Sequence, residues 1–96
     1  MIKIHFTQEA TNNLVHQALY IFELTLDAQK ADKYLFTMKA HISQSLSYFP
    51  KLGRPAEEFG EGIRKLVHKN YTILYKIITK DEISIVAIYR ENFPNL

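Results

Sequence analysis

The C-terminal half of the chain constrains the fold most, because it contains three β-like runs separated by two minimal turns. β-Branched and aromatic residues fill 62–68, 70–78 and 83–90, as they do on the pleated, half-buried surface of a sheet. Lys69-Asn70 and Lys80-Asp81 stand at the turns, and Asn tolerates the left-handed backbone that a tight turn needs. This pattern predicts a three-stranded antiparallel meander.

The two turns determine which side chains of the meander share a face. If each turn has two residues, His68 lies opposite Tyr71 and Thr79 lies opposite Glu82. The face that carries three large residues of the central strand is then expected to pack in the core. Its members are Arg64, Leu66, His68, Tyr71, Ile73, Tyr75, Ile77, Ser84, Val86, Ile88 and Arg90.

The opposite face of the meander is the expected interaction surface. It carries Lys65, Thr72 and Lys76, so it faces solvent or a partner, yet it also carries four large apolar residues. An exposed apolar patch of this kind usually marks a binding site. Arg90 is the last residue of the third run, where the alternation of apolar and polar residues weakens, so its side chain can reach either face. The residues expected to contact a partner are Lys65, Leu74, Lys76, Ile78, Ile83, Ile85, Tyr89 and Arg90.

The N-terminal half reads as one strand followed by two helices. Residues 2–6 alternate apolar and polar side chains, the mark of a strand with one buried face. Thr7 and Asp27 are natural N-caps, and apolar residues follow each of them at spacings of three and four. Pro50 ends the second helix, and the Gly and Pro residues after it keep the following link out of regular structure. The apolar stripe of the second helix is Ala31, Leu35, Met38, Ile42, Ser45 and Phe49.

The predicted fold class is α+β: a strand, an antiparallel helix hairpin and a three-stranded antiparallel meander. Two helices joined by so short a link form a hairpin, and their apolar stripes must cover one sheet face. A chain of 96 residues is expected to make one domain, 1–96. The residues expected in the core between hairpin and sheet are Leu35, Met38, Ile42, Leu66, Ile73, Tyr75, Val86 and Ile88.

Composition narrows the functional classes. The chain has no Cys, so it forms neither disulfides nor thiolate metal sites. Its net charge of +2, from twelve Lys and Arg against ten Asp and Glu, is far from the strong bias of a dedicated nucleic-acid binder. We find no signal-peptide pattern and no apolar run long enough to span a membrane. We therefore expect a cytoplasmic protein without membrane contact.

No catalytic or metal-binding motif stands out in the sequence. The histidines at positions 5, 16, 41 and 68 lack the spacing of a helical metal site, and we expect neither a metal nor a cofactor. The glycines form no phosphate loop, and no Ser or Cys nucleophile is evident. Lys65 and Arg90 are the two weak catalytic candidates, whereas Arg64 is expected to form a salt bridge with a helix carboxylate at the rim.

Three motifs occur in order between Phe49 and Tyr75. They are Phe49-Pro50-x-Leu52-Gly53-Arg54-Pro55, Gly62-Ile63-Arg64-x-Leu66 and Asn70-Tyr71-x-Ile73-Leu74-Tyr75. Together with the element order and the closing apolar strand, they resemble the RelE/ParE superfamily of bacterial type II toxins, and most of all its ParE branch. The resemblance implies a toxin of the plasmid-stabilisation type that is neutralised by a cognate antitoxin. It also implies one of two targets: ParE-type toxins are associated with inhibition of DNA gyrase, and RelE-type toxins cut mRNA on the ribosome.

The residue set that the RelE resemblance implies for mRNA cleavage is largely missing. The RelE pattern has two lysines on the second strand of the sheet, where this chain has Ile63 and Lys65, and an arginine where it has Thr72. It also has an arginine past the last strand, where Arg90 is nearest, and a C-terminal tyrosine, where the tail offers Phe93. Cleavage needs cations for the phosphate and an acid–base group, so we expect a ParE-like toxin that inhibits gyrase by binding. The alternatives are a ribosome-dependent mRNA endonuclease with an altered site and an inactive homologue that only binds antitoxin.

Overall fold

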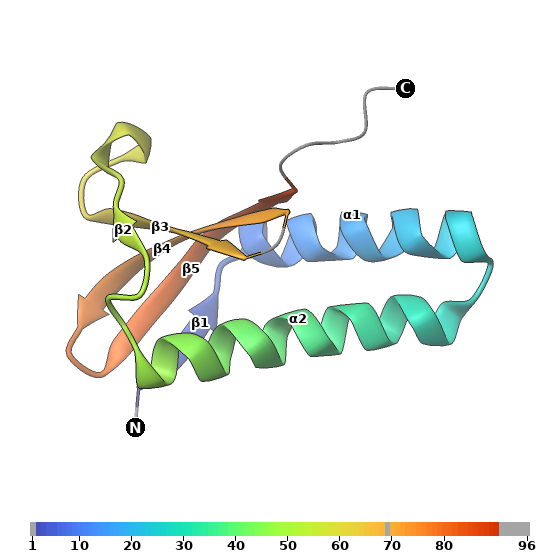
Figure 1. Cartoon of the computed structure of the whole chain (residues 1–96), viewed down its shortest axis with the longest axis horizontal. Coiled ribbons are helices and arrows are strands. Elements are labelled where there is room, and N and C mark those ends of the chain that lie inside the picture. Colours follow the sequence, from blue (N-terminus) through green and yellow to red (C-terminus); the bar gives the residue numbers. More distant parts are fainter. Residues whose placement is uncertain (1, 69, 91–96) are drawn as a thin grey trace.

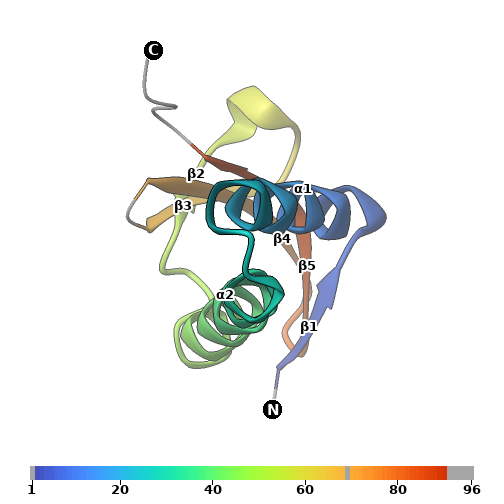
Figure 2. The same cartoon turned by 90° about the vertical axis from the view of Figure 1, so that its right-hand side faces the viewer.

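The computed structural model describes residues 2–68 and 70–90, and it has an α+β fold in the predicted element order. The two helices form an antiparallel hairpin against one face of a five-stranded sheet (Figure 1; Figure 2). The strand order is β1-β5-β4-β3-β2; β1 is parallel to β5, and the other neighbours are antiparallel. The elements are β1 (Lys3–Phe6), α1 (Gln8–Thr25), α2 (Ala28–Tyr48), β2 (Arg54–Pro55), the 3-10 helix η1 (Glu57–Phe59), β3 (Ile63–His68), β4 (Tyr71–Thr79) and β5 (Glu82–Arg90).

Both helices begin at the predicted caps. The Thr7 hydroxyl accepts a hydrogen bond from the Ala10 N–H at 3.1 Å and donates one to the Val86 carbonyl oxygen at 3.0 Å, which ties the start of α1 to β5. Asp27 accepts bonds from two backbone N–H groups in the first turn of α2, at 3.0 and 3.2 Å. Between the helices, Leu26 has a φ of 54°, the left-handed conformation that ends many helices. Within the described residues, neither helix has the length and apolar character needed to cross a membrane.

The core lies between the hairpin and the sheet. Leu14 of α1 and Leu46 of α2 are fully buried there against the central strands. The predicted stripe of α2 is wrong at its end, because Leu46 takes the place that was expected for Phe49, and Phe49 lies beyond the helix and is 64% exposed. Leu35 and Leu66 are half-buried against the same cluster. The prediction of a buried core residue is confirmed for Met38, Ile42, Ile73, Tyr75 and Ile88.

Two irregularities in the pairing of β4 with β5 cancel each other. An extra residue on β4, Ile78, shifts the register by one position, and an extra residue on β5, Val86, restores it. A one-residue shift moves side chains to the opposite face of a sheet. Residues 83–85 of β5, between the two bulges, therefore face the other way from the prediction. The observed pairs are Thr79–Glu82, Ile77–Ile83, Lys76–Ser84, Tyr75–Ile85 and Leu74–Ala87.

The bulges correct four of the predicted face assignments, those of Ile83, Ser84, Ile85 and Val86. Ile83 and Ile85, predicted on the face away from the helices, are fully buried in the core under the hairpin. Val86, predicted in that core, is half-buried on the opposite face, where it packs against a second and smaller apolar cluster. This second cluster consists of Ile63, Leu74 and Ala87.

The link between α2 and β3 is anchored to the central strand. The Tyr75 hydroxyl donates to the Pro50 carbonyl oxygen at 2.7 Å and accepts from the Gly53 N–H at 2.9 Å. Gly53 leaves no room for a side chain, because a Cβ would lie 2.7 Å from the carbonyl oxygen of Lys65. Arg64 donates to the Gly53 carbonyl oxygen at 2.9 Å. Its expected salt bridge with a helix carboxylate is wrong for the described residues, since the guanidinium binds backbone carbonyls of this link.

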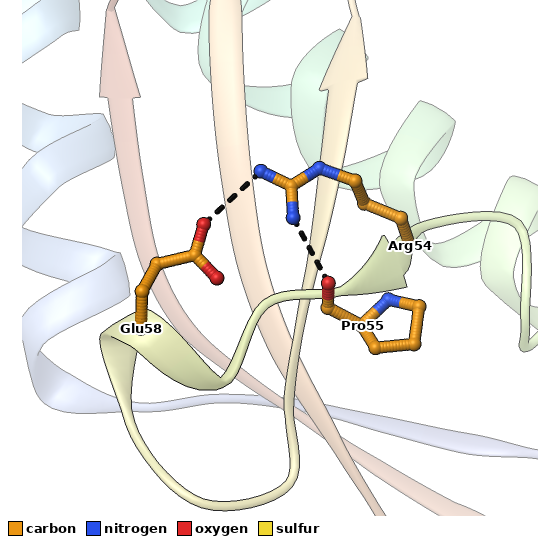
Figure 3. Close-up of polar contacts among 3 residues, drawn as sticks. All are labelled: Arg54, Pro55 and Glu58. Atoms are coloured by element: carbon orange, nitrogen blue, oxygen red, sulfur yellow. Dashed lines mark hydrogen bonds and ion pairs between the residues drawn. The ribbon is translucent and has the colours of Figure 1, made fainter.

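The same link contains β2 and η1, which the sequence pattern did not predict. The Arg54 guanidinium donates to the Pro55 carbonyl oxygen at 2.9 Å and to the Glu58 carboxylate at 3.2 Å (Figure 3). The pKa of the Glu58 carboxylate is held below its ordinary value, first by its own backbone N–H and then by Arg54. Both side chains of this ion pair are more than half exposed, so we expect it to order the link without adding much stability.

Candidate functional site

The open face, defined as the side of the sheet away from the hairpin, brings three of the predicted partner-binding residues together. Lys65 on β3, Lys76 on β4 and Tyr89 on β5 all lie on this side according to the strand pairing. Lys76 is exposed, and Tyr89 is 46% exposed. The Lys65 ammonium lies 5.9 Å from the centre of the Phe59 ring, which belongs to η1. Two cations and a tyrosine thus share one surface.

An apolar floor lies beneath these side chains. The second cluster is nearly buried although neither helix of the hairpin covers it, with Ile63 at 8%, Leu74 at 5% and Ala87 at 3% exposure. Thr72 is also buried on this face, and its hydroxyl has no hydrogen-bond partner among the described residues. The open face therefore combines charged and aromatic side chains with a buried apolar cluster beneath them. This composition suits protein recognition.

The prediction that four apolar residues form an exposed patch on the open face is wrong. Ile83 and Ile85 lie in the core on the other side of the sheet. Leu74 does lie on the open face, but it belongs to the buried floor. Ile78 is 51% exposed at the bulge of β4. A partner of the open face can therefore reach Ile78, whereas the core isoleucines are inaccessible.

The two weak catalytic candidates lie on opposite sides of the sheet. Arg90 at the end of β5 faces the hairpin, where its guanidinium carbon lies 6.0 Å from the centre of the Tyr20 ring of α1. Its Nε is buried and has no hydrogen-bond partner among the described residues. Lys65 belongs to the open face, so the two cations cannot act together on one phosphate.

Three positions of the RelE nuclease pattern, occupied here by Ile63, Lys65 and Thr72, lie on the open face. Ile63 is buried and apolar, and Thr72 is buried and uncharged, so neither supplies a cation to the surface. Lys65 is the one residue of these three positions that supplies a cation to the open face. Phe93 lies outside the described residues.

The far half of the helix hairpin forms a second exposed surface, which the sequence reasoning missed. The hairpin extends well past the strands in Figure 1, so this half has no sheet to cover. Val15, Leu19 and Phe22 of α1 are 39–51% exposed and line a shallow groove with Ala31 and Leu35 of α2. Their spacing of three and four along α1 was the available signal. This hairpin groove is an unpartnered apolar surface of the kind that binds another chain.

The fold also brings together two histidines that stand far apart in the sequence. The rings of His41 on α2 and His68 on β3 have centres 3.9 Å apart and an angle of 31° between their planes. Beside them, Tyr34 of α2 and Tyr71 of β4 have ring centres 6.0 Å apart. Only the packing of α2 against the sheet creates these contacts, so no spacing in the sequence indicates them. Among the described residues, no group of three or more metal-binding side chains occurs.

Comparisons with known proteins agree with this architecture. Residues 4–92 match the family model described as the ParE toxin of the type II toxin–antitoxin system parDE. The chain belongs to this family of toxins. A solved chain of the chromosomal ParDE toxin–antitoxin system from P. aeruginosa superimposes with a TM-score of 0.71 over 95% of this chain and 97% of that one, at 18% identity. At this identity the likeness shows the fold. No curated protein sequence matches significantly.

Proposed function

We propose that this toxin acts in the cytoplasm by binding DNA gyrase and that a cognate antitoxin neutralises it. The observation that carries the proposal is the open face, where Lys65, Lys76 and Tyr89 are presented without the other cations of the nuclease pattern. Cleavage of RNA requires charge stabilisation at the scissile phosphate and a group that moves a proton. Inhibition by binding requires only a complementary surface with an anchor, and an exposed tyrosine on the same face as two lysines supplies one.

The target is tested with two purified systems. We expect the wild-type toxin to inhibit supercoiling by gyrase, or to trap cleaved DNA on it, and to leave mRNA intact in a translation system. Tyr89→Ala is expected to weaken gyrase inhibition by about tenfold or more, because it removes the aromatic anchor of the open face. Tyr48→Ala is the matched control, because Tyr48 is 71% exposed at the end of α2, away from this face.

Each outcome of this experiment leads to a different conclusion. Codon-specific mRNA cuts that disappear in Lys65→Ala would replace the gyrase proposal with a ribosome-dependent endonuclease. Equal inhibition by the Tyr89 and Tyr48 variants would remove the open face as the binding surface. Inactivity in both systems would leave a homologue that binds antitoxin without being toxic.

We assign the antitoxin to the hairpin groove. Support comes from its exposed Val15, Leu19 and Phe22, since an apolar strip between two helices fits the apolar side of a partner helix. The open-face patch, proposed from the sequence for this role, retains only Ile78 as an accessible apolar residue among its four members. The hairpin groove does not overlap the open face, so we expect the antitoxin to make further contacts beyond this groove when it neutralises the toxin.

The hairpin groove offers a matched pair of leucines for a binding titration. Leu19 is 51% exposed inside the groove, and Leu24 is 67% exposed on the same helix but does not line it. We expect Leu19→Asp to weaken antitoxin binding by about tenfold or more, because a buried unpaired carboxylate is costly. Leu24→Asp is expected to bind like the wild type. Equal affinity of both variants would exclude the hairpin groove.

A further inference from the structure

A groove at the end of the sheet, here called the Tyr71 groove, lies on both sides of Tyr71. One hollow of about 510 Å³ lies between α2 and the strands β3 and β4, and Lys30, Lys33, Tyr34, His41 and His68 line it. A smaller hollow of about 180 Å³ lies toward α1, where His16, Tyr20 and Arg90 form its wall. Tyr71 lines both hollows, so they adjoin each other at its side chain.

The charges of the Tyr71 groove have one sign. Lys30 and Lys33 are both exposed on α2 and line the larger hollow, and Arg90 lines the smaller one. No carboxylate of the described residues lines either hollow. The modest net charge of +2 is therefore distributed unevenly, because three cations line these two adjoining hollows. Such a groove favours an anionic ligand.

Aromatic rings stand between these cations. Tyr34 and Tyr71 contact each other at the junction of the hollows, and the imidazoles of His41 and His68 form a second ring pair in the larger hollow. The Tyr34 hydroxyl donates to the side-chain oxygen of Gln17, which holds the ring between α2 and α1. Burial, together with a hydrogen bond to Tyr71, raises the pKa of Tyr34 well above its ordinary value. The Tyr34 ring is thus held in place with its hydroxyl protonated.

We propose that the Tyr71 groove binds an unpaired nucleic-acid strand. Lys30, Lys33 and Arg90 would neutralise successive phosphates, and the tyrosine and histidine rings would provide faces on which bases stack. The site lies on the hairpin side of the sheet, so it is separate from the open face assigned to gyrase.

The aromatic content of the groove favours nucleic acid over an acidic peptide. Carboxylates of a peptide would use the lysines and Arg90, but they would not use the surfaces of the tyrosine and histidine rings that line the groove. Every nucleobase offers such a planar face next to a phosphate. The proposal does not rest on gyrase inhibition, because binding is measured on the toxin alone.

The test measures the fluorescence anisotropy of a labelled single strand of about eight nucleotides, a length within the usual site size. We expect the double variant Lys30→Ser/Lys33→Ser to bind about tenfold more weakly and to lower the slope of log K against log salt by about 1.4, the value for two lost phosphate contacts on a single strand. The control Lys3→Ser/Lys39→Ser removes the same charge from β1 and from a lysine of α2 that lies over Phe6. It is expected to keep both the affinity and the slope.

A second pair of variants tests stacking. Tyr71→Leu removes the ring and is expected to weaken binding at least about fivefold, whereas Tyr71→Phe keeps the ring and is expected to bind within about twofold of the wild type. Circular dichroism melts show whether each variant is folded. The two lysines are exposed, so their double variant keeps the proposal testable even if Tyr71→Leu unfolds.

Three competing probes distinguish the sources of the negative charge. We expect the duplex form of the strand, a free nucleoside monophosphate and a glutamate-rich peptide of equal charge each to compete more weakly than the single strand. A peptide that competes equally or better would overturn the proposal in favour of an acidic protein partner. Loss of binding in the Lys3/Lys39 control equal to that in the Lys30/Lys33 variant would reduce it to general charge attraction, and so would also overturn it.

Discussion

Tyr75 and Thr72 are two buried hydroxyl-bearing residues of β4 that face opposite sides of the sheet. Under the hairpin, the Tyr75 hydroxyl both donates to and accepts from the link after α2. On the open face, the Thr72 hydroxyl has no hydrogen-bond partner among the described residues. Buried polar groups in native proteins are almost always bonded. We interpret this difference as a difference in role. The face covered by the hairpin maintains the fold, and the open face serves to bind a partner.

The apolar clusters on the two faces show the same contrast. Among the described residues, the cluster under the hairpin has ten buried members drawn from both helices and from β4 and β5, and the cluster on the open face has three. Stability should therefore be far more sensitive to changes under the hairpin than to changes at the exposed positions of the open face. Three substitutions test this contrast, and the expected effects decrease from the first to the last.

Ile73→Ala is expected to have the largest effect. Ile73 of β4 is fully buried in the core under the hairpin, and truncation of such a side chain leaves a cavity. The free energy of unfolding should fall by about 2–5 kcal/mol, measured by urea denaturation. Val67→Ala is the control on the open face, where Val67 is 54% exposed, and it should change stability by no more than about 0.5 kcal/mol. Similar losses for the two variants would contradict the contrast between the faces.

Tyr75→Phe is expected to have an intermediate effect. The ring still fills the core, but the Gly53 N–H and the Pro50 carbonyl oxygen lose their partner. The free energy of unfolding should decrease by about 1–3 kcal/mol, and amide hydrogen exchange at Gly53 should accelerate. The exposed Tyr48 provides the control, since Tyr48→Phe breaks no hydrogen bond among the described residues and should melt like the wild type. Unchanged exchange at Gly53 in Tyr75→Phe would show that the link is held by Arg64 instead.

The sequence predicted the elements of this fold because their signals are local. The caps at Thr7 and Asp27 and the turn between Thr79 and Glu82 act over a few residues and were confirmed, whereas the predicted alternation was wrong for residues 83–86 of β5. The bulges at Ile78 and Val86 were not predictable, because both residues are ordinary strand formers and neither is a glycine. Because the bulges were not predicted, Ile83 and Ile85 were assigned to a partner surface, whereas the structure places them in the core.

The candidate site was less predictable than the fold, because it depends on tertiary contacts. Lys65, Lys76 and Tyr89 share a face by alternation alone, so the sequence brought them together correctly. The stacking of His41 on His68 requires α2 to cross the end of β3, which no spacing indicates. Arg90 lies on the hairpin side only because the second bulge restores the register before the strand ends.

Thr72→Val is expected to have the smallest effect on stability and the opposite sign. Valine matches threonine in shape and favours strands, and it removes a buried hydroxyl that has no partner among the described residues. The free energy of unfolding should stay the same or rise by up to about 1 kcal/mol. Thr7→Val makes the same chemical change where the hydroxyl caps α1 and binds Val86, and it should lower stability by about 1 kcal/mol. If Thr72→Val is stabilising and also weakens gyrase inhibition, the open face retains this hydroxyl for its partner. If it is destabilising, the hydroxyl is bonded within the toxin, and the contrast between the two faces of β4 does not hold.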